Sequence, residues 1–444
     1  MKRFLAALLA ALGLMGTLSG CSLNLAASPE DLYTLPQLPA EYAELNHSIR
    51  QLIEAGAEYA APTAGTNLQP LQLVDLDGDG EEEALAFLRR GSDERALKIY
   101  IYERTESGYT QSAVIEGSGT AIYSVDYRDL DGDGRQEILV SWKVGPEVQA
   151  LSVFTLRLGT PRELMNSSYI RYAAADLDGD GREEILTFRA DEQGAGTADY
   201  YAWTGDGTLA PAGVARLSMT MAELSAGQVL SGTLRGGEPA VFATGVSDSR
   251  VQVTDILALR DGELGNLTVS DSTGVSREIY RYLGLFPTDI DGDGVTELPV
   301  PEELLSSGDT ESGCRVSWRS YDAAGTGETA LSAYHALADG WYLVLPESWG
   351  EGLSVRTEGT GTDASMASFG IGAGDGRIEI LRIYTFSGEN RETLAAKGGR
   401  VLLSREGETI YSAELLEAGA FTLTEDSLRQ SFHRVSRVWS RGGN

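Results

Sequence analysis

The chain has 444 residues, of which 42% are hydrophobic, and its 35 Lys and Arg stand against 66 Asp and Glu, for a formal net charge of −31 at pH 7. This composition excludes a disordered acidic chain and argues against nucleic acid binding, because no basic surface is present to displace phosphate counterions. It also argues against adsorption to anionic lipid by charge, whereas it fits a protein that binds cations.

Residues 1–21 are typical of a secretory signal peptide. Two basic residues precede an apolar stretch, Phe4–Leu18, whose 15 residues are short of the about 20 that a membrane-spanning helix needs. The sequence that ends at Cys21, Leu-Ser-Gly-Cys, resembles the lipobox of bacterial lipoproteins. That resemblance implies cleavage before Cys21, a diacylglyceryl group on its thiol, and an extracytoplasmic protein anchored to the membrane by lipid. The alternative is an ordinary signal peptide with an incidental Cys.

Residues 22–65 are predicted to be a tether followed by one helix. The segment 22–40 contains several prolines, and apolar residues then recur at 42, 45, 49, 52 and 53. This spacing predicts an amphipathic helix that packs on the domain that follows.

Residues 66–340 contain an internal repeat. A string of the form D-[LI]-D-G-D-G-x-x-E, followed by apolar residues, begins at Asp75, Asp129, Asp176 and Asp289. The starts are 54, 47 and 113 residues apart, and 113 is about two steps of 56, so one further unit is expected between Asp176 and Asp289. Strand-like segments flank each string, which predicts a mainly β array of about five four-stranded units.

The expected further unit is a degenerate copy. "GGEPAVFATG" stands where "GREEILTF" would stand, and Glu238 lies 54 residues after Glu184. An alignment without gaps puts Leu230, Gly232 and Leu234 in the places of the three Asp residues. This copy is therefore predicted to keep the turn and the strand but to bind no metal.

The repeated string resembles the FG-GAP/VCBS repeats, which build the β-propeller of integrin alpha chains and of many bacterial surface proteins. The resemblance implies a β-propeller with a cation in each acidic loop. Two features depart from the family pattern: Glu at the ninth position, where integrin blades often carry Asp, and five units where seven blades are usual.

Each intact string offers hard oxygen ligands at positions 1, 3, 5 and 9, which is close to the spacing of an EF-hand loop for Ca²⁺. Position 12 falls in a strand, so the string is not an EF-hand. Mg²⁺ is less suitable because it demands stricter octahedral geometry. The alternatives are an Asx-turn without an ion and a catalytic carboxylate pair, although identical carboxylates in four units fit a structural repeat better. About four Ca²⁺ sites are therefore predicted, with the ligands Asp75, Asp77, Asp79, Glu83; Asp129, Asp131, Asp133, Glu137; Asp176, Asp178, Asp180, Glu184; and Asp289, Asp291, Asp293, Glu297.

Residues 341–444 carry no acidic string and are predicted to form a C-terminal α+β domain, an antiparallel sheet with a terminal helix. Apolar residues at 428, 432, 435, 438 and 439 give that helix one buried face. The segments 276–284 and 301–308, within the repeat region, are expected to be helical insertions.

No catalytic signature is evident. The three histidines, His47, His335 and His433, show no metal-ligand spacing, and Cys314 lies in a strand-like context typical of a small buried residue. The first hypothesis is a non-catalytic, lipid-anchored, calcium-binding cell-surface protein whose propeller binds a protein or a glycan. The alternatives are an extracellular polysaccharide-active enzyme, with its site in the propeller channel or at the domain junction, and an envelope-assembly factor. Fold alone does not choose between them.

Overall fold

A computed structural model describes residues 42–435 apart from 107, 147, 158, 271, 305–312 and 362. The predicted signal peptide, Cys21 and the tether lie outside the described residues, as do Val438 and Trp439. No helix within the described residues has the length and apolar character that a membrane span requires.

The predicted N-terminal helix is present as α2 (Ala43–Glu54), which buries Leu45 and Ile49. These two side chains pack against Ala86 and Tyr100 on one face of the first sheet. We call this sheet blade 1; its strands are β1 (Glu58–Tyr59), β2 (Leu71–Val74), β3 (Glu83–Arg89), β4 (Leu97–Thr105) and β5 (Gly108–Gly117).

Blades 2 and 3 are regular antiparallel four-stranded meanders in which each strand pairs with the next one along the chain. Their second strands are buried at nearly every position, because neighbouring sheets cover both faces. Blade 2 consists of β6 (Ala121–Arg128), β7 (Glu137–Lys143), β8 (Gln149–Arg157) and β9 (Thr160–Tyr169), and blade 3 of β10 (Arg171–Ala175), β11 (Glu184–Ala190), β12 (Gly196–Trp203) and β13 (Leu209–Arg216).

Blade 4 follows a short helix, α3 (Met221–Ser225), that begins with a capping box at Thr220. The segment 276–284, expected to be helical, instead supplies a short strand that pairs with the third strand of this blade. Short-range apolar spacing did not distinguish this added edge strand from a helix. Blade 4 consists of β14 (Gln228–Thr233), β15 (Pro239–Val246), β16 (Val251–Arg260), β17 (Glu263–Asn266) and β18 (Ile279–Arg281).

Blade 5 takes two strands from the region predicted to be a separate C-terminal domain. Its strand order is β19-β20-β21-β22-β28, so the predicted boundary at 340/341 lies inside this sheet. The predicted terminal helix ends early, at α5 (Glu425–Ser431), and the chain continues as a strand that pairs with Trp341–Leu343. The strands of blade 5 are β19 (Leu298–Glu302), β20 (Cys314–Tyr321), β21 (Gly327–Ala336), β22 (Trp341–Val344) and β28 (Phe432–Arg434). The second expected helical insertion begins within β19, and its residues 305–308 lie outside the described residues.

The sixth sheet, sheet 6, has the strand order β23-β24-β25-β27-β26, and α4 (Arg391–Ala396) contacts its strands. Its Phe369 and Leu381 pack against Trp341 of blade 5 in one apolar cluster. Sheet 6 consists of β23 (Leu353–Gly361), β24 (Ala364–Ile371), β25 (Ile378–Phe386), β26 (Val401–Glu406) and β27 (Thr409–Leu415).

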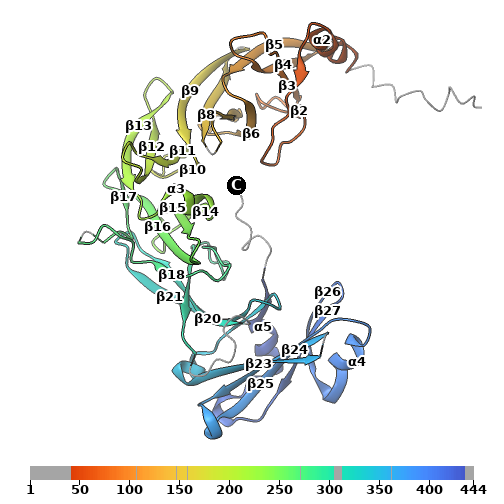
Figure 1. Cartoon of the computed structure of the whole chain (residues 1–444), viewed down its shortest axis with the longest axis vertical. Coiled ribbons are helices and arrows are strands. Elements are labelled where there is room, and N and C mark those ends of the chain that lie inside the picture. Colours follow the sequence, from red (N-terminus) through yellow and green to blue (C-terminus); the bar gives the residue numbers. More distant parts are fainter. Residues whose placement is uncertain are drawn as a thin grey trace, which may run out of the picture.

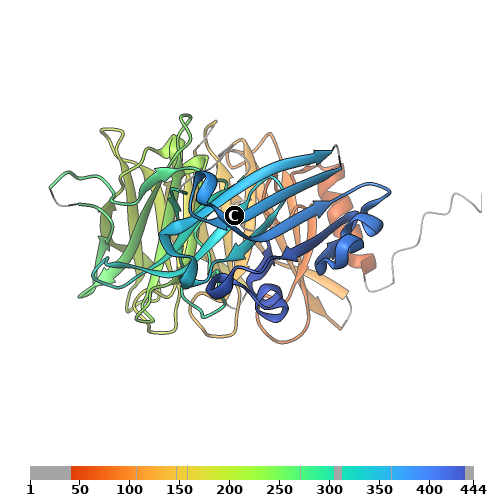
Figure 2. The same cartoon turned by 90° about the horizontal axis from the view of Figure 1, so that it is seen from below.

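Consecutive sheets are stacked face to face, because an apolar cluster with residues from both sheets lies between each neighbouring pair. Phe87 and Trp142 join blades 1 and 2, for example, and Phe242 and Tyr321 join blades 4 and 5. Figure 1 shows the six sheets following one another along an open arc, from blade 1 to sheet 6. Seen from below, the arc is one layer of sheets with sheet 6 in front (Figure 2). The predicted mainly β, propeller-like array is therefore confirmed, although only blades 2 and 3 have the predicted four strands and each of the other sheets has five.

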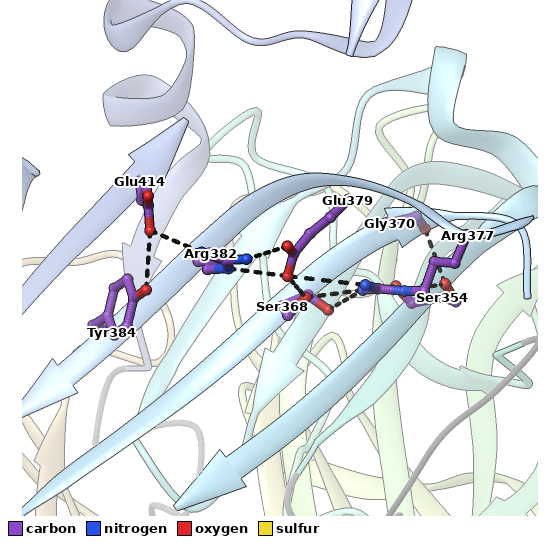
Figure 3. A network of polar contacts seen from close by, with 8 residues as sticks. All are labelled: Ser354, Ser368, Gly370, Arg377, Glu379, Arg382, Tyr384 and Glu414. Atoms are coloured by element: carbon purple, nitrogen blue, oxygen red, sulfur yellow. Dashed lines mark hydrogen bonds and ion pairs between the residues drawn. The ribbon is translucent and has the colours of Figure 1, made fainter. Parts of the chain in front are cut away.

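The face of sheet 6 that points away from blade 5 carries a ladder of polar side chains (Figure 3). Arg382 donates hydrogen bonds from Nε to Glu379 Oε1 (3.0 Å) and from Nη1 to Glu414 Oε2 (3.2 Å). Arg377, whose side chain is only 7% exposed, donates to the hydroxyls of Ser354 (2.9 Å) and Ser368 (3.0 Å). We call Ser354, Ser368, Arg377, Glu379, Arg382, Tyr384 and Glu414 the Arg–Glu ladder.

Candidate metal centres

The first three acidic strings form the connection between the first and second strands of a blade, and the fourth lies just before β19 of blade 5. The loops span 75–82, 129–136 and 176–183, between β2 and β3, β6 and β7, and β10 and β11. The fourth loop spans 289–296 and is closed by an isolated bridge between Thr288 and Glu297. We number them loops 1 to 4 in chain order.

Two glycines in each loop explain why the chain turns there. In loop 3, Gly179 and Gly181 have φ values of 77° and 89°, a region that residues with a side chain rarely adopt. This conformation lets the backbone N–H groups of both glycines donate to the carboxylate of Asp176, at 2.7 and 3.0 Å. The first Asp of the string therefore folds the loop as well as offering an oxygen to a cation.

The glutamate at position 9 is buried beneath the loop. Glu184 is 1% exposed, and its Oε2 accepts a hydrogen bond from the backbone N–H of Leu177 at 2.9 Å. The corresponding bonds are 2.8 Å from Leu76 to Glu83, 2.9 Å from Leu130 to Glu137 and 3.1 Å from Ile290 to Glu297. The Leu or Ile at position 2 of each string thus has a role that the sequence analysis missed, although its recurrence was visible.

The structure brings together three of the four predicted ligands in every loop. In each group, one carboxylate oxygen from each residue lies within 4.8 Å of the others. The groups are Asp75, Asp77, Glu83; Asp129, Asp131, Glu137; Asp176, Asp178, Glu184; and Asp289, Asp291, Glu297.

The Asp at position 5 lies outside these groups. Oδ1 of Asp180 accepts a hydrogen bond from the backbone N–H of Arg182 at 2.9 Å, and Asp79, Asp133 and Asp293 make the same bond two residues on. Asp180 also pairs with the guanidinium of Arg182, whose hydrogen bond lowers the pKa of the carboxyl. Position 5 therefore stabilises the turn, and its carboxylate lies outside the groups that converge within 4.8 Å.

Burial without a counter-charge raises the pKa of the four glutamates. Removal from water is the largest cause of the raised pKa, and the charges of the neighbouring Asp residues raise it further. The hydrogen bond from the backbone N–H at position 2, which belongs to Leu177 in loop 3 and Ile290 in loop 4, lowers it. The pKa of each of the four glutamates is raised to about 7. A bound cation would reverse this balance, because it favours the ionised carboxylate.

In loop 4, one oxygen of the buried glutamate lacks a partner that a cation could provide. Oε1 of Glu297 is buried and has no hydrogen-bond partner, while its residue is 0% exposed. A buried carboxylate oxygen without a partner is costly. The three converging carboxylates therefore fit a hard divalent cation with oxygen ligands.

One basic residue competes for such a site. Arg157, at the end of β8, lies 3.4 Å from Asp131 and 3.6 Å from Asp133 in loop 2. This residue is remote in sequence from the string, so no local pattern could have indicated it.

The strand register of blade 4 shows that the alignment of the degenerate copy without gaps was wrong. Thr233 pairs with Pro239, as Ala175 pairs with Glu184, so the connection has five residues (234–238) instead of eight. Leu230 and Gly232 consequently lie within β14 and not in a loop. The backbone N–H of buried Leu234 donates to the carbonyl of Glu238 at 2.8 Å, so a backbone acceptor replaces the carboxylate.

Histidine and cysteine do not add to these centres. Trp318 Nε1 donates to Nε2 of His335 at 3.1 Å, and burial lowers the pKa of His335 to about 3. His433 stacks on Tyr342, with ring centroids 5.0 Å apart, and His47 bonds to Gln51 on α2 at 2.9 Å. Burial raises the pKa of the Cys314 thiol to about 12.

The stacked sheets and repeated acidic loops define the class of propeller-like β-repeat proteins. Within it, a family model described as FG-GAP-like repeat matches residues 75–140, from the first residue of loop 1 into β7. The FG-GAP resemblance is thereby confirmed for this segment. The chain is also similar to a crystal structure of a protein from Lactobacillus plantarum, with 10% identity over 69% of this chain and 89% of that chain. The TM-score of 0.24 is too low to support an argument from that structure. No curated protein matches the chain.

Proposed function

We propose that the four loops bind Ca²⁺ and that the protein is a non-catalytic, lipid-anchored binding protein of the cell surface. The observation that carries the calcium proposal is the fourfold recurrence of two Asp and one buried Glu within 4.8 Å of one another. Oxygen ligands from a flexible loop suit Ca²⁺ better than Mg²⁺, which demands stricter octahedral geometry and gives up its waters reluctantly.

In this role the metal would act on the blades and not on a substrate. In blades 1 to 3 the carboxylate group lies where the first two strands are connected, and in blade 5 it lies where the chain enters β19. At each of these places like charges otherwise repel one another. Ca²⁺ would offset that repulsion and fix the connection. The repetition of the same group in four blades favours a structural part over an active centre, since an active centre needs only one.

The rest of the proposal rests on the sequence. The Cys21 lipobox supports lipid anchoring and an extracytoplasmic location, and the rigid array would then present its surface to a protein or glycan partner. The acidic composition supports neither nucleic acid nor an anionic lipid surface as that partner.

Isothermal titration of the full chain with Ca²⁺, in a mild detergent after removal of bound metal, tests the calcium proposal. We expect about four ions per chain, with dissociation constants of about 10⁻⁴–10⁻³ M, as for other extracellular modules. If the titration up to 10 mM Ca²⁺ gives no heat of binding and Ca²⁺ does not stabilise the folded chain, the calcium proposal is refuted. Labelling with a radioactive fatty acid, compared between the wild type and Cys21→Ser, tests the anchor.

A further inference from the structure

Loops 1 and 2 are joined directly through buried backbone. The N–H of Leu76 donates to Glu83 of its own loop, and the C=O of Leu76 accepts a hydrogen bond of 2.8 Å from the N–H of Gln136 in loop 2. Gln136 immediately precedes Glu137, the buried carboxylate of loop 2. One buried residue, Leu76, therefore lies between the carboxylate of one loop and the residue that precedes the carboxylate of the next.

The same connection joins loops 2 and 3. The N–H of Leu130 donates to Glu137, and its C=O accepts a hydrogen bond of 2.7 Å from the N–H of Glu183, the residue before Glu184. The guanidinium of Arg128 adds an ion pair of 2.8 Å to Glu183 across the same junction. Three buried carboxylates are thus connected in series through two leucines.

The glycines show how closely these loops are stacked. A Cβ on Gly78 would lie 2.4 Å from the carbonyl oxygen of Gly134, and a Cβ on Gly132 would lie 3.3 Å from that of Gly181. The first distance is shorter than real Cβ contacts. A change in the shape of one loop is therefore passed to its neighbour by contact as well as by hydrogen bonds.

Blade 4 interrupts this series. Within the described part of the chain, no backbone hydrogen bond joins the shortened turn 234–238 to the carbonyl of Leu177 in loop 3. Loop 4 makes the equivalent bond at the other side, from the N–H of Thr296 to the C=O of Thr233 at 2.9 Å. Thr233 is the last residue of β14, and the turn that follows it holds no group of three converging carboxylates, so within the described residues loop 4 has no cation site as its neighbour in blade 4.

We infer that the four cation sites are of two kinds: loops 1, 2 and 3 bind Ca²⁺ as one cooperative row, and loop 4 binds it independently. This inference rests on the proposed calcium binding. An ion in one loop holds its glutamate and its position-2 leucine in place, which orders the residue that precedes the glutamate of the next loop. Sites linked in this way have a coupling free energy, and the coupling is reciprocal.

The test compares two matched substitutions in the full chain, titrated with Ca²⁺ alone. Asp178→Asn in loop 3 and Asp291→Asn in loop 4 remove the same charge from the same position and keep an acceptor for the N–H of the residue at position 5. We expect Asp178→Asn to weaken binding at loops 1 and 2 by about fivefold or more. Asp291→Asn should remove one site and leave the other three unchanged within about twofold.

Hydrogen–deuterium exchange of the wild type during the same titration gives a readout that needs no variant. The amides of Gln136 and Glu183 should become protected together over one narrow range of Ca²⁺ concentration, and the amide of Thr296 over a different range. Four equal sites with independent protection would overturn the cooperative row while leaving calcium binding intact. A wild type that binds no Ca²⁺ would overturn both proposals.

Discussion

The acidic loops and the Arg–Glu ladder hold carboxylates in opposite ways. Glu184 is buried with two Asp side chains, and its pKa is raised to about 7. Glu379 also loses contact with water, which raises its pKa, but its hydrogen bonds to Arg382 and Ser368 outweigh this and the pKa is lowered. Sheet 6 therefore carries the counter-charge for Glu379 itself, whereas in the proposed function Ca²⁺ would supply the counter-charge for the glutamates of the loops. Calcium and pH should distinguish the two regions.

Chelation should have the largest effect. With dissociation constants of about 10⁻⁴–10⁻³ M, 10 mM Ca²⁺ stabilises the folded chain by about 1.4 to 2.7 kcal/mol per site. EGTA should lower the melting temperature by several degrees, measured by circular dichroism, and excess Ca²⁺ should restore it. In hydrogen exchange the loss of protection should fall on blades 1, 2, 3 and 5 and spare sheet 6. An equal loss of hydrogen-exchange protection in sheet 6 would contradict the proposed difference between the acidic loops and the Arg–Glu ladder.

Changing the pH should give the next largest effect, with a size that depends on calcium. A glutamate whose pKa is raised from 4.5 to about 7 on folding contributes stability that is complete below pH 4.5 and is lost as the pH rises through 7. The calcium-free chain should therefore melt at a lower temperature at pH 8 than at pH 5. In 10 mM Ca²⁺ the difference between pH 5 and pH 8 should become clearly smaller, because Ca²⁺ binds the ionised carboxylate and therefore stabilises the chain more at pH 8 than at pH 5. The same pH difference in both buffers would count against metal binding at these glutamates.

Glu184→Gln should separate the charge of the loop from its shape. The amide oxygen can still accept the hydrogen bond from Leu177, so the turn should remain. We expect one Ca²⁺ site to be lost and the calcium-free protein at pH 8 to gain about 1–3 kcal/mol, since a buried charge is removed. Denaturant unfolding in EGTA measures the gain. Glu408→Gln, in the exposed turn between β26 and β27, is the control, and a calcium-free Glu184→Gln protein that is less stable than the wild type would contradict the argument.

Arg382→Met should weaken sheet 6 by a smaller amount, and independently of calcium. It leaves Glu379 and Glu414 without their shared partner, but these side chains are 27% and 38% exposed, so water moderates the loss to about 1–2 kcal/mol. Arg405→Met breaks an exposed pair with Glu392 and should cost well under 1 kcal/mol. A loss of stability for Arg382→Met that depended on Ca²⁺ would mean that the ladder and the loops are coupled.

The loops were predictable because their signature is local. Two glycines and four acidic residues within nine positions define both the turn and the ligands, and the following strand begins at once. The helix α2 was predictable for a similar reason, since its apolar spacing is a property of a short segment.

The parts that the sequence did not reveal depend on contacts between distant segments. β28 completes blade 5 by pairing with Trp341–Leu343, far away in the chain, so the last strand was read as a continuation of a helix. In sheet 6, β27 lies between β25 and β26, and only this order places Glu414 next to Arg382. The shortened turn of blade 4 was misaligned because only strand register shows where three residues are missing.

That shortened turn also bears on how such an array can be redesigned. Residues 234–238 connect two strands of a blade, bury a leucine and satisfy its N–H without any acidic side chain. A turn of this kind could replace an acidic loop in another blade. Grafted between β10 and β11, or between any other such pair, it offers a route to remove ion sites one blade at a time, and so to tune how much the whole array responds to the composition of its surroundings.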